Sequence, residues 1–165
     1  MAFFVTSGVV GSQKIADTST TQLHPLGTIV RAKDATLGEG EFIYLLGVAS
    51  TVVGSIVNYD GAGFQTALDT AAVTGPSRPL AVAMSANVAS QYGWYQISGL
   101  AVATKANTVS FADGAGLGSA SGLAVAVATG TVLQGAVVRT VASAKSDVTT
   151  VAIAINRPHG PSDVS

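Results

Sequence analysis

The stretch Gly40–Gly61, GEFIYLLGVASTVVGSIVNYDG, decides the fold class, because residues 42–59 carry no charge and are rich in β-branched and aromatic side chains. Side chains of these types favour β-strands. Ser50-Thr51 is a turn signal near the middle of the run, and Gly47 and Gly54 are typical of bulges or bends. We therefore predict two strands whose faces are both partly covered, either because the sheet closes into a barrel or because a neighbouring subunit lies on it.

The rest of the chain repeats this pattern of short β-like runs separated by Gly, Asp, Asn and Pro, which predicts an all-β fold. Gly118–Thr129 is the one stretch that stays ambiguous between strand and helix, because its alanines lower the β preference. About ten short strands indicate a compact β-barrel or β-sandwich. The predicted strands are GTIVRAKD (27–34), EFIYLLGVA (41–49), GSIVNYD (54–60), FQTALD (64–69), RPLAVAMSAN (78–87), YGWYQISGLAVATKA (92–106), TVSFAD (108–113), LAVAVATG (123–130), VLQGAVVRTVAS (132–143) and TTVAIAINRP (149–158).

The segment before the first of these runs has a different character. From Phe3 to about Leu26 the residues are small or polar and show no period, and the segment ends in the turn signal His24-Pro25. This predicts an extended N-terminal arm over residues 1–26, which gains order by lying on something else, followed by a single β domain over residues 27–165. Within the arm, Phe3, Phe4 and Val5 are candidate interface residues.

Alternation along one late run predicts how it packs. In VAIAI, residues 151–155, Val151, Ile153 and Ile155 share one face of the strand and alanines occupy the other. The small alanine side is expected to let a second layer approach closely.

The charge content restricts the classes of partner. Charged residues make up 10% of the 165-residue chain, against about 25% in a typical globular domain. Eight basic and nine acidic residues give a net charge of −1, so we infer that much of the surface faces other protein. The scattered basic residues argue against nucleic-acid binding, and the absence of cysteine excludes disulfides and thiolate metal sites. The uncharged span Gly114–Val138 is interrupted by glycines and hydroxyl residues, which argues against a membrane span.

The residues that could support catalysis do not form a recognisable motif. His24 and His159 each lie beside a proline and lack a nucleophile or orienting partner nearby in sequence, so we interpret them as solvent-exposed turn histidines. Glu39 and Glu41 would share one face of a strand, but we favour a solvated, negatively charged loop. The glycine cluster Asp113–Gly122 lacks the spacing of a dinucleotide loop and predicts a hairpin. We therefore expect no enzyme activity, no cofactor and no metal site.

The densest aromatic group is Tyr92, Trp94 and Tyr95, which includes the single tryptophan. Strand alternation places Trp94 and Tyr95 on opposite faces, so both faces carry aromatic bulk. The group is a candidate interface as well as a candidate core, because aromatic side chains anchor both. It would also suit a stacking platform in a carbohydrate-binding or host-attachment module, provided that the rings are accessible.

Three segments together carry a resemblance to a known family: Leu26–Asp60, then Arg78–Ala103, then VLQGAVVRTVAS with TTVAIAINRP. The most specific parts are GEFIYLLGVAST (40–51) and QYGWYQISG (91–99). In order and spacing the segments resemble the head decoration, or cement, proteins of tailed bacteriophages.

This resemblance implies a non-enzymatic, β-rich structural protein. Such proteins are made in the host cytoplasm and add to the outer surface of the virion capsid, often as homotrimers, where they bind the major capsid protein and stabilise contacts between its subunits. Neither nucleic acid nor a membrane is an expected partner. The alternative from another class is the carbohydrate-binding or host-attachment module of a virion.

Overall fold

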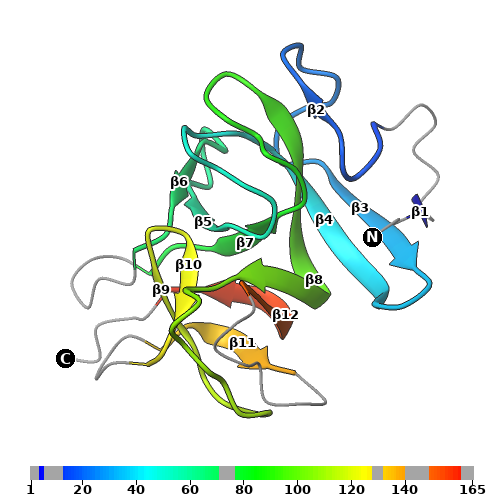
Figure 1. Cartoon of the computed structure of the whole chain (residues 1–165). Coiled ribbons are helices and arrows are strands. Elements are labelled where there is room, and N and C mark those ends of the chain that lie inside the picture. The colour runs from blue at the N-terminus through cyan, green and yellow to red at the C-terminus, as the bar shows by residue number, and fades with distance from the viewer. Residues whose placement is uncertain (1–3, 6–12, 71–76, 128–131, 140–148, 161–165) are drawn as a thin grey trace.

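The computed structural model describes residues 4–5, 13–70, 77–127, 132–139 and 149–160, and these contain twelve strands and no helix (Figure 1). The all-β prediction is therefore confirmed. The strands are β1 (Phe4–Val5), β2 (Thr18–Ser19), β3 (Ile29–Asp34), β4 (Gly38–Leu46), β5 (Ile56–Tyr59), β6 (Thr66–Leu68), β7 (Leu80–Ala83), β8 (Tyr92–Thr104), β9 (Gly118–Ala120), β10 (Leu123–Val125), β11 (Gln134–Val138) and β12 (Thr150–His159).

Ten of these strands belong to one antiparallel sheet, and β9 and β10 form a separate hairpin. The order along the main path of the sheet is β1-β3-β4-β8-β7-β5-β6. The long strand β8, which has 13 residues, runs through the middle of the molecule and also pairs with β2 and β12, and β11 adds to the far side of β12 (Figure 1).

The path from β4 to β6 closes on itself. An isolated bridge joins Leu46 at the end of β4 to Gln65 just before β6, and the Leu46 N–H donates to the Phe64 carbonyl at 3.1 Å. Strands β4, β8, β7, β5 and β6 therefore form a small barrel within one chain. Its interior is filled by Ile43, Leu45, Val57, Ala81, Ala83, Tyr95 and Ile97.

A second core lies on the outside of β5 and β7, because β8 bends at Gly99, where φ is +101°. Beyond this bend β8 pairs with β12 over Ser98–Thr104, and His159 at the end of β12 bridges to Pro79 beside β7. The main members of this core are Ile56, Leu80, Val82, Ala101, Ala103, Phe111, Leu117, Leu133, Val138, Val151, Ile153 and Ile155. The Val/Ile side of β12 thus faces this core.

The described part of the predicted arm is part of the folded domain. Ile15 is 2% exposed and belongs to a third core with Val30, Phe42, Tyr44 and Trp94 among its members. β2 pairs with the start of β8, and β1 pairs with β3 at the sheet edge. Residues 13–26 therefore gain their order by lying on the sheet of their own chain.

One other local prediction is corrected, and one ambiguity is resolved. The run 108–113 forms no strand and instead connects β8 to β9, with Phe111 buried in the second core. The ambiguous stretch from Gly118 is a β-hairpin rather than a helix. Its two-residue turn, Ser121-Gly122, has φ values of 49° and 79°, which match the type I′ turn that suits the twist of paired strands.

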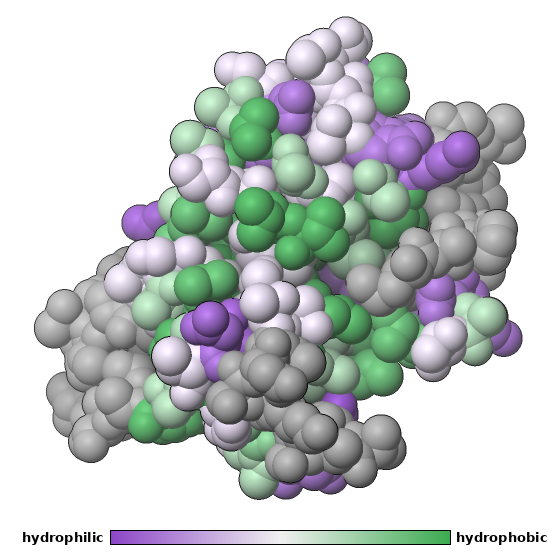
Figure 2. Space-filling view, in the orientation of Figure 1, coloured by the Kyte–Doolittle hydropathy of each residue, from purple (hydrophilic) through white to green (hydrophobic). Residues whose placement is uncertain are grey.

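Figure 2 shows that hydrophobic residues gather across the middle of one side of the molecule, while strongly hydrophilic residues are few and scattered. In Figure 1 the connection between β4 and β5 crosses this same middle region. The described residues contain no helix of the length and apolar character that a membrane crossing requires.

Candidate functional site

The aromatic group of β8 lies in the protein core. Trp94 and Tyr95 have no exposed surface, and Tyr92 is half-buried. Trp94 packs edge-on against Tyr44 at a ring distance of 5.0 Å, and its indole N–H donates to the Gln13 carbonyl at 3.0 Å. The prediction that Trp94 and Tyr95 contact a partner is wrong for this fold, because neither side chain reaches the surface. A stacking platform for sugars would need the same exposure.

Burial also determines the chemistry of Tyr95. It raises the pKa of the Tyr95 hydroxyl to about 12, although Thr66 and Asn87 lie close enough to oppose part of that effect. This tyrosine is therefore a neutral core residue at any physiological pH.

The three arm residues proposed as an interface divide into two groups. Phe3 lies outside the described residues. The backbones of Phe4 and Val5 form β1, which pairs with Lys33 and Ala32 of β3. These two residues are thus assigned to the edge of the sheet of their own chain.

The two histidines occupy different environments. His24 is half-buried and packs edge-on against Tyr44, with the ring centres 5.1 Å apart. Its Nε2 accepts a hydrogen bond from the Gln13 N–H at 3.2 Å. The prediction of an exposed turn residue is therefore wrong for His24. His159 is exposed, as predicted, and its Nδ1 lies 3.0 Å from the Ser77 hydroxyl.

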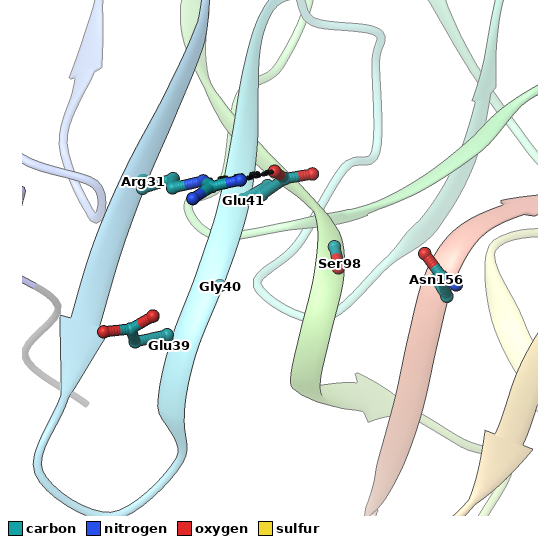
Figure 3. Close-up of a pocket in the computed structure, with 6 residues that line it drawn as sticks. All are labelled: Arg31, Glu39, Gly40, Glu41, Ser98 and Asn156. Atoms are coloured by element: carbon teal, nitrogen blue, oxygen red, sulfur yellow. Dashed lines mark hydrogen bonds and ion pairs between the residues drawn. The ribbon is translucent and has the colours of Figure 1, made fainter. Parts of the chain in front are cut away.

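A charged cluster centres on Glu41, which lies on strand β4 rather than in a loop (Figure 3). Arg31 of β3 contacts one carboxylate oxygen at 3.2 Å, and Arg157 of β12 contacts the other at 3.0 Å. Two guanidinium groups thus occupy both oxygens of one carboxylate. Glu41 is consequently unsuited to act as a general base, and Glu39, two residues earlier on the same face, is exposed.

The backbone explains how the distant Arg157 reaches Glu41. Pairing in register places Arg31, Glu41, Ser98 and Asn156 in one row across β3, β4, β8 and β12 (Figure 3). Arg157 follows this row with φ at +44°, a left-handed conformation at an irregularity in the β11–β12 pairing.

A shallow, open hollow of about 370 Å³ lies along the row. Its lining is polar and consists of Arg31, Glu39, Gly40, Glu41, Ser98 and Asn156. The hollow thus presents carboxylate, guanidinium, hydroxyl and amide groups to any polar surface that contacts it. Among the described residues, no three His, Asp or Glu side chains come together as metal ligands.

Two apolar surface features were not identified as functional from the sequence. The first is the β4–β5 loop, residues 47–55, in which Val52 and Val53 are 49% and 52% exposed. Its backbone is held by hydrogen bonds to strands β7 and β8. The Gly54 N–H donates to the Ala83 carbonyl at 2.8 Å, and the Gly54 carbonyl accepts from the Thr104 N–H at 2.8 Å.

The second feature is the β11–β12 hollow, an open space of about 360 Å³. It is lined by Gly135, Ala136, Val137, Ala154, Ile155 and Asn156, of which only Asn156 has a polar side chain. Ala154 belongs to the small side of β12 that the alternation VAIAI predicted. In the sequence, only the adjacent valines between turn residues indicate an exposed apolar loop, and only the alanines of VAIAI indicate the hollow.

Comparisons of the chain with protein-family models, curated proteins and solved structures found no match. The family that the sequence resembles therefore stays a prediction.

Proposed function

We propose that this chain is a decoration, or cement, protein that binds the major capsid protein on the outer surface of a tailed-phage head and stabilises contacts between capsid subunits. It acts as a homotrimer and reaches the virion from the host cytoplasm. The observation that carries the proposal is the combination of a rigid all-β scaffold with an uncharged loop that exposes Val52 and Val53.

The physical role is mechanical. A cement protein works by bridging, and each contact contributes roughly 25 cal/mol per Å² of apolar area buried, before the cost of association is subtracted. Where the backbone is already held by hydrogen bonds, as in the β4–β5 loop, that cost is lower, because less conformational freedom is lost on binding. Several contacts on one trimer then add up through high effective concentration.

The polar groups support the same interpretation. Glu41 is held by two arginines and helps to join three strands. The hollow beside it is open and lacks the enclosed, apolar character that is typical of small-molecule sites.

The proposal is tested by sedimentation. Purified protein is mixed with undecorated heads of the phage that encodes it, the heads are pelleted, and the bound protein is measured over a concentration series. Saturable co-sedimentation, with heads that withstand higher temperature before releasing DNA, is the expected result. Protein that stays in the supernatant at all concentrations would refute a role as a capsid cement.

A further inference from the structure

The chain carries an apolar projection and an apolar hollow at different places on its surface. The projection is the β4–β5 loop with Val52 and Val53, and the hollow lies between β11 and β12. We infer that the β4–β5 loop of one copy docks into the β11–β12 hollow of a second copy of this chain. The inference rests on the homotrimer in the proposed function and identifies the surfaces that form it.

The loop has the properties of a pre-organised anchor. Valine side chains are stiff because two heavy atoms branch at Cβ. The loop backbone is held by hydrogen bonds inside the loop, from the Thr51 N–H to the Val48 carbonyl at 3.3 Å and from the Ser55 N–H to the Val52 carbonyl at 3.0 Å. A further bond from the Thr104 hydroxyl holds the Val53 carbonyl at 3.2 Å. Little conformational entropy therefore remains to be lost when the two valines are covered.

The hollow matches this anchor in chemistry, since both are apolar. Its lining includes the small residues Gly135 and Ala154 and the apolar side chain of Val137. None of the six lining residues is charged, and neither is any residue of the loop 47–55. Docking therefore requires no charged side chain of the loop or of the hollow lining to lose its water, which is a large cost of covering charged surface.

The relative positions of the two features determine the kind of assembly. In Figure 1 the loop crosses the upper middle of the molecule, whereas β11 and β12 lie below it. A contact between two different surfaces of identical chains is heterologous, and such contacts close into rings when the rotation between copies allows it. A trimer is the ring that the proposed function requires. The net charge of −1 adds little repulsion between copies.

Two variants each remove one side of the contact. Val53→Lys places a charge on the projection, and Ala154→Arg fills and charges the hollow. The matched control is Val88→Lys, because Val88 is 39% exposed and lies in the β7–β8 connection, beside Gly47 at the start of the loop and not in the Val52-Val53 tip or the hollow. In sedimentation velocity, each of the first two variants should weaken association by at least about tenfold, which corresponds to about 1.4 kcal/mol. The control should behave like the wild type.

Mixing the two defective variants gives the decisive result. A Val53→Lys copy keeps its hollow and an Ala154→Arg copy keeps its loop, so one good contact can form between them. The mixture should therefore form dimers more readily than either variant alone does. A symmetric contact through a single face would not be restored by mixing.

Cross-linking tests the contact without charged substitutions. The chain has no cysteine, so the variant Val53→Cys/Ala154→Cys introduces the only two thiols. Mild oxidation should link chains into disulfide-bonded oligomers, and Val88→Cys/Ala154→Cys should not do so. Any of three results would overturn the inference. The first is an oligomer mass in both charged variants that equals that of the wild type, the second is the absence of cross-links, and the third is a wild type that is monomeric at all concentrations. Co-sedimentation with heads, measured on the same preparations, tests the proposed function separately.

Discussion

Replacing Ile15 by alanine should destabilise the whole domain, although Ile15 lies in a segment whose sequence is typical of a loose arm. The side chain is 2% exposed and packs in the third core beside Val30, Phe42 and Trp94. The segment is also fixed by polar contacts, since the Tyr44 hydroxyl donates to the Gln13 side-chain carbonyl at 3.0 Å.

The expected cost follows from the burial. Isoleucine-to-alanine changes in a core cost about 2–5 kcal/mol, as transfer free energy is lost and a cavity remains. Ile15 covers one face of the sheet from a short segment that can relax toward the gap, so the lower part of that range, about 2–3 kcal/mol, is expected. A detachable arm would give a change close to zero.

The measurement is urea denaturation at one fixed protein concentration, followed by the fluorescence of Trp94, the only tryptophan. The control is Leu23→Ala in the same segment, because Leu23 is 55% exposed and its loss should cost less than about 0.5 kcal/mol. Equal and small effects for the two variants would refute the conclusion that residues 13–26 are part of the core.

Three further predictions concern single residues. Gly99→Ala should lower the free energy of unfolding by more than about 2 kcal/mol, because φ is +101° and the added Cβ would meet the Glu39 carbonyl oxygen. Thermal unfolding measures this loss, and an unchanged midpoint would contradict the bend at this residue. Glu41→Gln should cost only about 0.5–1 kcal/mol, because both of its arginine partners are largely exposed to water, and a loss that does not shrink in 1 M salt would contradict this. Burial raises the pKa of Tyr95 from 10.0 to about 12, so the folded state holds this proton more tightly than the unfolded chain. Stability should therefore be unaffected by this group below pH 10 and fall by about 2–3 kcal/mol as the pH rises to 12, and Tyr95→Phe should reduce that slope.

The strands that could be predicted are those whose signal is local. Residues 42–59 form β4 and β5 around a turn at Ser50, where φ is +66°, because β-branched runs and turn residues act over a few positions. The opposite orientation of Trp94 and Tyr95 follows from strand periodicity alone, and the two residues lie in different cores. The sequence does not predict whether the barrel closes within one chain, because closure depends on a contact between Leu46 and Gln65, which lie at the end of β4 and just before β6.

The features that could not be predicted depend on contacts between distant residues. The segment 13–26 lacks a hydrophobic period, and its order comes from single contacts of Gln13, Ile15 and His24 with the sheet. Likewise, the sequence places Glu41 and Arg157 116 residues apart, and only the pairing of β8 with both β4 and β12 brings them together. Run 108–113 had β-type residues but no partner strand to pair with among the described residues.

The way in which polar side chains are used links the fold to the proposed role. Gln13 ties the N-terminal segment to the sheet, Gln96 donates to the Ser98 and Leu100 carbonyls at the bend of β8, and Glu41 binds two arginines. These groups therefore hold the scaffold together. The β4–β5 loop and the lining of the β11–β12 hollow, by contrast, carry no charged residue. Covering these two surfaces costs little desolvation, which fits the proposed role of stabilising an assembly by contact alone.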